Sequence, residues 1–469
     1  MKRLFVFALL IFSTFSSLIA QHKGHISGII LNKNTQSPVM GVLIQLANTK
    51  FATLSDSTGK YSFKNIPTGQ YQISYTNMGY LPYTSYNVII SSGNEVVNTI
   101  ELVPQDIVLK EVIVGGNRKT VRAATLETPL SVQKLTTEEI KSSPGSNFDI
   151  SKVVQTLPGV TGSASTGAGF RNDIIVRGGA PNENVFYLDG IEIPVINHFS
   201  TQGSAGGPQG ILNVSFIDEV KLSTSAFDAK FDNALSSVFE FKQKRGNPNK
   251  LETNIRMGAT EFASTFNGPL SKSGKTTFLA SARRSYLQYL FHVLDLPIRP
   301  NFWDFQYKIT HQIDPKTTLT FLGVGAIDDF YFVAPINATP EKIYALNSSP
   351  SINQWNYTMG TSLKRLINRG YWTLSISRNH LNNLNEKYED NLSQNKGELT
   401  LQFRSNEIEN KLRFDITKNF LGIKWTTGAN IQTVEYDNFT YQILKNYIPS
   451  SNNNVLVSPL TYNYFTNLG

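Results

Sequence analysis

The sequence predicts a mainly β protein in three parts: a small β-sandwich, an α/β domain and a long antiparallel sheet that forms part of a barrel. Three observations support this fold class. Short alternating strands recur about every ten residues over residues 21–104. Residues 125–246 combine short strands, two short helical patterns and glycine-rich turns. From residue 247 to 469, long alternating strands are joined by connections that are short and long in turn.

Composition and charge exclude several classes of protein. A length of 469 residues suggests about two to four domains. Beyond the N-terminus no run of about 18 apolar residues occurs, which argues against spanning helices but leaves barrel strands open, because these alternate. Cysteine is absent, so disulfides and thiol nucleophiles are excluded. The net charge of +8 is spread out, so no nucleic-acid partner is expected.

Residues 1–20 have the features of a secretory signal peptide. Lys2 and Arg3 form the charged region, an apolar stretch follows from Leu4 to Phe12, and Ala20 is a small residue before the cleavage site. Since the chain has no cysteine, it has no site for a lipoprotein anchor. We therefore expect the mature chain to leave the cytoplasm.

Residues 21–104 are predicted to form the sandwich. Apolar residues alternate with polar ones, as in half-buried strands, at Val42, Ile44 and Leu46 and again at Tyr71, Ile73 and Tyr75. The sequence D-S-T-G at residues 56–59 is typical of a turn. The succession G-x-I-x-G, G-V-x-I, D-S-T-G-x-Y-x-F and P-x-G-x-Y-x-I-x-Y resembles the carboxypeptidase-regulatory-like domain. That resemblance implies a transthyretin-like, immunoglobulin-like sandwich without catalytic activity.

The most informative stretch is DIIVRGGAPNENVFYLDGIEIP, residues 173–194. Two β-rich runs are separated by a glycine-rich turn, and Asp-Gly after the second run is a strong hairpin signal. The stretch resembles the signature of the plug domain of TonB-dependent outer-membrane receptors. Its signature residues are Gly178, Gly179, Asn184, Leu188, Asp189 and Gly190. The resemblance implies a plug over residues 125–246.

Other parts of this domain follow from local patterns. Helices are expected at residues 136–141 and 147–157, and a strand at 216–222. The segment 227–238 resembles the sequence that closes such plugs. Asp232 occupies the place of the usual glycine there, which leaves the geometry of that turn open.

A linker, residues 105–124, separates sandwich and plug. It contains the hexapeptide Leu109, Lys110, Glu111, Val112, Ile113 and Val114. This hexapeptide resembles the TonB box of Bacteroidetes-type receptors, and an extended β-branched peptide can add as a strand to an exposed sheet edge of TonB. The alternative is that it forms the last strand of the sandwich. Its position between module and plug favours TonB binding.

The predicted wall strands are residues 252–259, 262–270, 276–286, 302–313, 317–327, 354–366, 371–381, 398–416 and 421–436, and a tenth begins near the end. Side chains alternate between apolar and polar, as in Trp372, Thr373, Leu374 and Ser375, which suits lipid on one face and a polar lumen on the other. Receptors of this family close a barrel of about 22 strands. We therefore expect about nine or ten strands of a truncated outer-membrane β-barrel. All four tryptophans lie in this part, which indicates either an interfacial girdle or ordinary core packing.

The resemblance implies a receptor in the outer membrane with its N-terminal domain in the periplasm. It would take up a scarce extracellular ligand, of which a siderophore-type metal chelate is the first choice, driven by TonB and its inner-membrane energising complex. Outer-membrane lipid would surround the wall, and a surface lipoprotein partner is left open. The alternatives are an importer of glycan or peptide and a surface-binding β-protein without transport.

Arg177 of the R-G-G turn is the main candidate for a single functional residue. In the family, this arginine takes part in charged contacts between plug and barrel, and a buried arginine needs a partner. Glu183 within the plug is one candidate partner, and carboxylates of the wall are others; the alternative is a solvated arginine. No hydrolase, zinc-protease or phosphate-loop motif occurs, and the six histidines are scattered. No enzymatic activity, metal site or cofactor is therefore expected.

Overall fold

The computed structural model divides the chain into two compact units, Met1–Val112 and Ile113–Gly469. It describes residues 23–90, 95–105, 132–136, 140, 149–162, 173–200, 207, 209–224, 227–258, 260–392, 398–420, 423–447 and 455–468. The predicted signal peptide and the hexapeptide Leu109–Val114 lie outside the described residues. None of the helices in the described part is long and apolar enough to span a bilayer.

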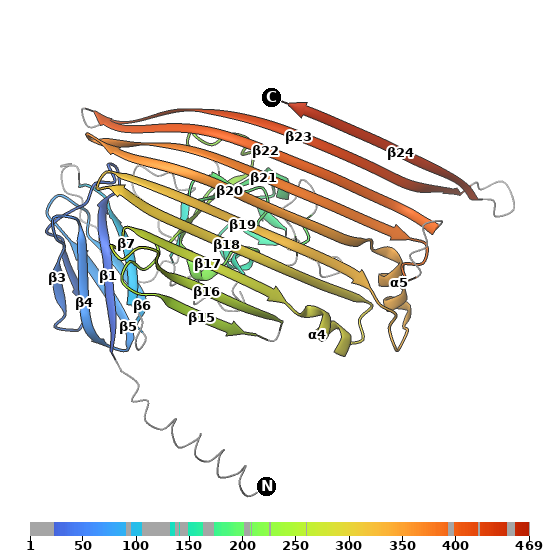
Figure 1. The fold of residues 1–469 in the computed structure, drawn as a ribbon, viewed down its shortest axis with the longest axis horizontal. Coiled ribbons are helices and arrows are strands. Elements are labelled where there is room, and N and C mark those ends of the chain that lie inside the picture. Colours follow the sequence, from blue (N-terminus) through green and yellow to red (C-terminus); the bar gives the residue numbers. More distant parts are fainter. Residues whose placement is uncertain are drawn as a thin grey trace, which may run out of the picture. The chain divides into compact units, whose positions relative to one another are not determined.

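The first unit is a sandwich of two sheets, drawn in blue in Figure 1. The strand order is β4-β1-β7 in one sheet and β3-β2-β5-β6 in the other. The strands are β1 (Lys23–Asn32), β2 (Leu43–Leu46), β3 (Ala52–Leu54), β4 (Lys60–Pro67), β5 (Gly69–Thr76), β6 (Tyr83–Ile90) and β7 (Glu95–Leu102). Ile26, Ile44 and Ile73 belong to one fully buried apolar cluster that includes residues from both sheets. The predicted sandwich is confirmed.

The predicted turn at Asp56 shows how the local sequence ends one strand and starts the next. The Asp56 carboxylate accepts hydrogen bonds from the backbone N–H groups of Thr58 and Lys60, at 2.8 and 2.9 Å. Gly59 has a φ of +73°, and a Cβ atom there would lie 2.5 Å from the carbonyl oxygen of Ile30. This position therefore requires glycine, both for its backbone conformation and for the close approach of β1.

The second unit contains the plug and the wall. The plug has a five-stranded sheet of order β12-β11-β14-β13-β8 and a separate pair, β10-β9. Its strands are β8 (Val132–Thr136), β9 (Val160–Gly162), β10 (Ile174–Val176), β11 (Asn184–Leu188), β12 (Ile191–Glu192), β13 (Ile217–Ser223) and β14 (Ser237–Gln243). Its helices are α3 (Ile150–Val154) and the short 3-10 turns η2 (Pro181–Glu183) and η3 (Val214–Phe216). Strands β11 and β14 run parallel, whereas the other pairs in this sheet are antiparallel.

The plug differs from the prediction in two places, the strand pairing around the R-G-G turn and the length of one helix. The R-G-G turn does not close a hairpin, because β10 pairs with β9 whereas β11 pairs with β12 and β14. The helix expected at residues 147–157 is only Ile150–Val154, since Asp149 is its N-cap and accepts a hydrogen bond from the N–H of Ser151. Of the helix expected at residues 136–141, Ile140 is helical, Thr136 is the last residue of β8, and the other residues lie outside the described part.

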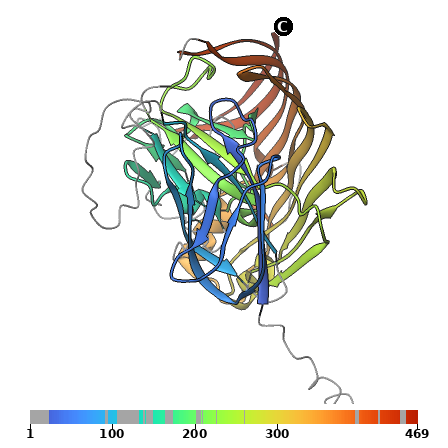
Figure 2. The same cartoon turned by 90° about the vertical axis from the view of Figure 1, so that its left-hand side faces the viewer.

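The wall is one antiparallel sheet of ten described strands, β15 to β24, in sequence order. They are β15 (Glu252–Met257), β16 (Glu261–Pro269), β17 (Thr276–Ser285), β18 (Ile298–Asp314), β19 (Thr317–Phe332), β20 (Ser351–Ile367), β21 (Gly370–Tyr388), β22 (Leu399–Phe420), β23 (Ile423–Tyr447) and β24 (Val455–Leu468). Helices α4 (Leu287–Val293) and α5 (Pro340–Ser348) lie in long connections at the same end of the wall (Figure 1). Figure 2 shows that the sheet is curved and that the plug, in teal and green, lies on its concave side. The predicted partial barrel is confirmed.

Several wall strands are longer than predicted because they stay paired beyond the expected start of the long loops. Strand β19 continues to Phe332, which pairs with Ile298 at the start of β18. Pro300, expected in a loop, lies within β18. The pairing of β17 with β18 ends at Trp303, so around Pro300 the strand has a neighbour on the β19 side only. A proline is tolerated in such a place because its missing N–H group has no partner to lose.

The alternation predicted for the wall separates two faces. In β20, Gln354, Asn356 and Thr358 are buried, whereas Trp355 and Tyr357 between them are partly exposed. The buried face is polar, and it is the face that the plug covers, since Gln354 donates a hydrogen bond to the carbonyl of Ser200 in the plug, at 2.8 Å. Polar side chains of the wall therefore point toward the plug.

Candidate functional site

The interface between plug and wall is the best-defined functional region of the described chain. Part of it is apolar: Leu322, Val324 and Ala326 of β19 belong to the same buried cluster as the plug core. Gly360 of β20 makes room for the plug, because a Cβ atom there would lie 2.3 Å from Cδ1 of Ile191. The apolar contact fixes the position of the plug, and polar contacts surround it.

The predicted Asp189-Gly190 turn contacts the wall. Both residues have positive φ, 50° and 85°, as a two-residue hairpin turn between β11 and β12 requires. The Asp189 carboxylate accepts hydrogen bonds from the backbone and side-chain N–H groups of Gln243, both at 2.9 Å. It also pairs with Nζ of Lys308 in β18, at 2.9 Å. This signature residue thus connects two plug strands and the wall.

Another signature residue, Asn184, holds the plug itself together. Its side-chain N–H groups donate to the carbonyl oxygens of Ile174 and Pro181, at 2.7 and 3.1 Å. Its side-chain oxygen accepts from the hydroxyl of Ser237, at 2.6 Å. Leu188 is fully buried in the plug core. These two residues stabilise the fold and do not contact the wall through these bonds.

Around the R-G-G turn, the two glycines have different roles. Gly178 has a φ of +81° with open space around it, whereas a Cβ atom on Gly179 would lie 2.4 Å from the hydroxyl oxygen of Ser236 and 2.7 Å from Oε2 of Glu183. Gly178 allows the positive φ of the turn, and Gly179 allows Ser236 and Glu183 to pack closely against the backbone.

Arg177 and Glu183 do not form an ion pair with each other among the contacts of the described residues. Arg177 is exposed, has a φ of 49°, and donates its backbone N–H to the carbonyl of Gly159, at 2.9 Å. Glu183 is half-buried, and its backbone carbonyl accepts from the N–H groups of Leu235 and Ser236. A role of Arg177 and Glu183 in the contact between plug and wall remains a prediction.

The strongest polar contact of the interface involves a residue that the sequence did not single out. The His198 side chain is fully buried, and its Nδ1 and Nε2 atoms lie 2.6 Å from Asp328 and 3.0 Å from Asp304. The imidazole stacks on Phe302, with 3.8 Å between ring centroids. The second Asp328 oxygen accepts the backbone N–H of Phe199, at 2.8 Å.

Arg283 extends this cluster along the wall. It donates to Asp304 from Nε at 2.6 Å, and its NH1 group lies 3.5 Å from Glu261. Its other terminal nitrogen donates to the plug carbonyl of Gly210, and Glu261 accepts from the side chain of Gln209, at 2.7 Å. Within the described residues, no group of three or more histidine and carboxylate side chains is arranged to hold a metal ion. The arrangement binds the plug to the wall.

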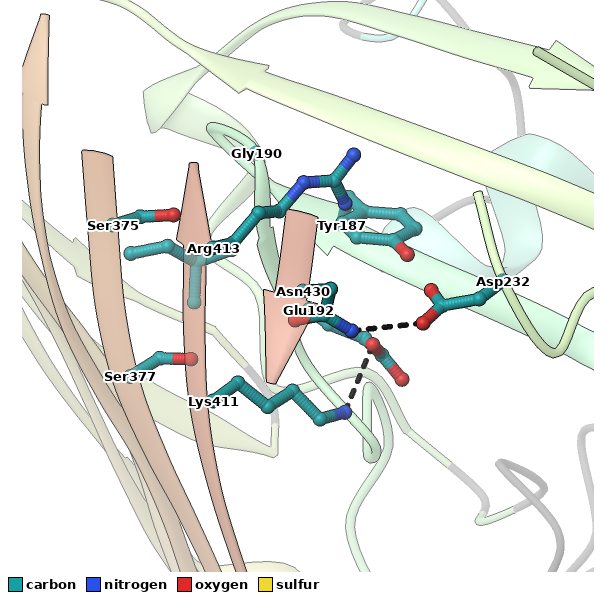
Figure 3. A pocket seen from close by; sticks show the side chains of 10 residues that line it. Tyr187, Gly190, Glu192, Asp232, Ser375, Ser377, Lys411, Arg413 and Asn430 are labelled. Carbon is teal, nitrogen blue, oxygen red and sulfur yellow. Dashed lines mark hydrogen bonds and ion pairs between the residues drawn. The ribbon is translucent and has the colours of Figure 1, made fainter. Parts of the chain in front are cut away.

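A second polar contact lies at strands β21 to β23 and surrounds a small cavity (Figure 3). Nζ of Lys411, a buried residue of β22, lies 2.8 Å from Glu192 of the plug and 2.9 Å from Glu409 of the wall. Asn430 of β23 donates to Asp232 of the plug, at 2.8 Å. Asp232 thus makes a wall contact where the family has glycine, and the positive φ of that turn, 57°, falls on Asn233.

Burial dominates the electrostatics of this second contact. Burial raises the pKa of Glu192, and the nearby ammonium of Lys411 opposes that shift. Burial likewise raises the pKa of the Tyr187 phenol, with smaller contributions from Glu192 and Asp232. Neither group is arranged as a nucleophile or a base. The contact is a charge pair across the interface.

Sequence reasoning found Asp189 but missed His198, Asp304, Asp328, Arg283 and Lys411. One signal was available for Asp304, a carboxylate on the polar face of the predicted strand 302–313, whereas Asp328 directly follows the predicted strand 317–327. No local pattern marks His198, which follows the apolar residues 195 and 196 as a single histidine.

Comparisons with known families agree with this geometry. Residues 26–114 match the family model of the CarboxypepD_reg-like domain. Residues 124–238 match that of the TonB-dependent Receptor Plug Domain. The chain carries the plug of a TonB-dependent receptor. Such receptors are transporters of the outer membrane and not enzymes, and the plug is seated here on a barrel wall.

The chain is also similar to solved structures over part of its length. One is a mutant ferric enterobactin receptor of Pseudomonas aeruginosa in complex with enterobactin, with 14% identity and a TM-score of 0.46, covering 72% of this chain and 55% of that one. Another is the outer membrane transporter YddB of Escherichia coli, with 12% identity and a TM-score of 0.48, covering 72% of this chain and 53% of that one. A third is the ferripyoverdine receptor of the outer membrane of Pseudomonas aeruginosa bound to ferripyoverdine, with 16% identity and a TM-score of 0.47, covering 68% of this chain and 44% of that one.

The plug-bearing chain spans about half the length of these solved receptors. A search of curated proteins gave no match.

Proposed function

We propose that this chain is part of a TonB-dependent receptor that imports a scarce ligand across the outer membrane. The observation that carries the proposal is a plug domain held on the concave face of a ten-stranded wall by buried ion pairs, within the described residues. A plug seated in this way closes the lumen of a barrel. Import then requires that energy from outside the barrel moves the plug.

The hexapeptide Leu109–Val114 is the proposed site where TonB supplies that energy. TonB would bind it as an added β-strand and pull on the chain that leads into the plug. The sandwich before it would then lie in the periplasm. The match to the N-terminal domain extends to residue 114, so the hexapeptide as last strand of that domain is the competing assignment.

The ligand that we propose is a siderophore-type metal chelate. Enterobactin and ferripyoverdine are bound in two of the solved receptors named above. A glycan or a peptide is the alternative cargo, and uptake assays with ferric chelates, oligosaccharides and peptides in cells that carry the full receptor would distinguish them.

A binding assay with the periplasmic domain of TonB tests the proposed energy coupling. The natural chain should bind this domain, and Val112→Pro should weaken binding by about tenfold or more, because proline removes a strand hydrogen bond. Val121→Pro, a matched change in the same linker but outside the hexapeptide, should bind like the natural chain. Equal binding by all three proteins would contradict the proposal and favour a surface-binding β-protein.

A further inference from the structure

We propose that the protonated side chain of His198 stabilises the contact between the plug and the barrel wall, and that loss of its proton weakens this contact. The His198 cluster is defined here as His198 together with Asp304, Asp328, Arg283 and Glu261, all of which are at most 5% exposed. One side belongs to the plug and the other to four neighbouring strands of the wall, β16 to β19. This contact would act in this way whatever ligand the receptor imports.

The hydrogen-bond geometry favours two N–H groups on the imidazole, because Asp304 lies closer to Nε2, at 3.0 Å, than the terminal nitrogen of Arg283, at 3.5 Å. Each ring nitrogen of His198 faces an oxygen of a different aspartate, at 2.6 Å for Asp328 and 3.0 Å for Asp304. Ionised carboxylates only accept hydrogen bonds, and a neutral imidazole has a single N–H group to donate. With a neutral ring, one nitrogen lone pair would face a buried anion. Only the imidazolium satisfies both aspartates.

The charges around the ring favour the same state. Carboxylates face the cluster from β16 (Glu261), β18 (Asp304) and β19 (Asp328). The nearby cations are Arg283 of β17 and Arg256 of β15, which both pair with Glu261. In the plug, Asp149 adds a further negative charge that acts on Arg283. Negative groups therefore outnumber the arginines, and protonation of His198 reduces the imbalance.

Burial and charge act in opposite directions on the proton of His198. Burial alone lowers the pKa of His198, but Asp328 and Asp304 outweigh it, so that the pKa is raised. Because the pKa of His198 is raised, the contact between plug and wall contributes its full stability below the ordinary pKa of about 6.5. It loses this stability as the pH rises through the raised pKa. The plug should therefore be held most tightly below about pH 6.5 and less tightly as the pH rises above that value.

The cluster is placed to act on the plug segment that carries His198. The backbone of this segment is held on both sides, since Asp328 accepts the N–H of Phe199 and Arg283 donates to the carbonyl of Gly210. Loss of the proton would leave one buried aspartate facing a lone pair, which disfavours the seated geometry.

The protonation state is measured directly by nitrogen NMR of histidine-labelled full-length chain in detergent micelles, with His198→Gln identifying the signal. We expect both ring nitrogens of His198 to be protonated at about pH 7.5, one unit above the ordinary value. A neutral tautomer at that pH would overturn the proposal. Asp328→Asn removes one carboxylate while keeping its shape, and it should lower the pKa of His198 by about one unit or more.

Hydrogen exchange tests the consequence for the plug. The amide of Ile211, which donates to the carbonyl of Ile196, reports on this segment. In His198→Gln its exchange should be about tenfold faster or more, since the variant loses a charged hydrogen bond between plug and wall. His311→Gln, which removes a wall histidine bonded to Thr276, is the control and should leave it unchanged. Equal exchange in His198→Gln and the natural chain would refute the role of His198 as a fastener.

Discussion

At the scale of single residues, the Asp189-Gly190 turn combines a demanding backbone shape with a contact to the wall. Gly190 has a φ of +85° and open space where a Cβ atom would lie. Aspartate is one of the few residues other than glycine that adopt the left-handed conformation, and the Asp189 carboxylate here accepts the backbone N–H of Gln243 on β14. The two functions of the turn can therefore be separated by mutation.

Gly190→Ala should destabilise the plug by about 1–2 kcal/mol, the cost of a left-handed conformation for an L residue. No steric term is expected, since nothing lies within 4 Å of the added methyl group. Native-state hydrogen exchange at the amide of Asp189, which donates to the carbonyl of Phe241, measures this free energy. Gly258→Ala, where the φ is not positive, is the control and should change the exchange little; an equal effect in both variants would contradict the prediction.

Lys411 is the cation between two carboxylates at the interface of plug and wall. In Lys411→Met, Glu192 and Glu409 would face each other across the interface without a cation. The loss of stability should be about 3–5 kcal/mol, as for other buried pairs from which one partner is removed. Urea unfolding of the purified chain measures it. Glu192→Gln in the same background should recover part of the loss, and no recovery would argue against charge as the cause.

The residue scale also shows what the sequence can and cannot predict. Asp189-Gly190 was predictable because the signal is local: two adjacent residues determine the turn. The partners of His198 were not, because Asp304 and Asp328 are separated from it by 106 and 130 residues, and only the packing of the plug on the paired strands β18 and β19 brings them together. The pairing of Arg177 with Glu183 rested on family resemblance, and the described residues show an exposed arginine there.

At the scale of elements, the two long connections at one end of the wall are tied to each other. The carboxylate of Asp295, after α4, accepts the N–H groups of Ile336 and Asn337, at 2.6 and 2.9 Å. It also pairs with Nζ of Lys342 on α5, at 2.6 Å. Hydrogen bonding from Lys342, followed by the two backbone N–H groups, lowers the pKa of Asp295 to about 2.

The contacts of Asp295 between the two long connections should depend on pH in a defined acidic range. Because the pKa of Asp295 is lowered in the folded state, its contribution is complete above the ordinary value of about 3.9 and is lost as the pH falls toward 2. Protection of the Ile336 amide from hydrogen exchange should therefore be present at about pH 5 and absent in Asp295→Asn. Protection that survives in the variant would show that other contacts hold the connection.

Strand existence and phase were predictable for the wall, whereas strand ends were not. The alternation of side chains is set by the sequence itself, and it placed every wall strand in the correct order. The ends depend on whether the neighbouring strand continues, as in the pairing of Ile298 with Phe332. In the plug, the R-G-G turn was correctly placed, but tertiary contacts decided that its two strands join different sheets.

At the scale of the molecule, the tryptophans indicate how the wall would lie in a bilayer. Trp303 and Trp355 share one row across β18 to β20, which meets β21 at Asn382. Trp372 and Trp425 lie near the opposite end of their strands. Along β21 the two levels are ten residues apart, about 33 Å of strand or about 25 Å after tilting, which matches the apolar band of such barrels. This spacing favours the interfacial girdle over ordinary core packing.

Ile376 lies between these two levels and is 60% exposed on the outer face. Ile376→Lys should therefore destabilise the wall in lipid by about 2–4 kcal/mol, the cost of a cation near the bilayer midplane. Ile376→Ala, which removes apolar surface without adding charge, should cost much less. Urea titrations in lipid vesicles and in lipid-free detergent compare the two variants; a lysine penalty of equal size in both media would contradict a lipid-facing position.

The position of β8 in the plug sheet has a mechanical consequence. In the order β12-β11-β14-β13-β8, it is the outermost strand and pairs only with β13, from Val132 opposite Ser223 to Thr136 opposite Glu219. A force transmitted from the preceding chain reaches Val132 first. A force that acts across the strand would separate β8 from β13 one residue pair after another, which needs less force than breaking all their hydrogen bonds at once.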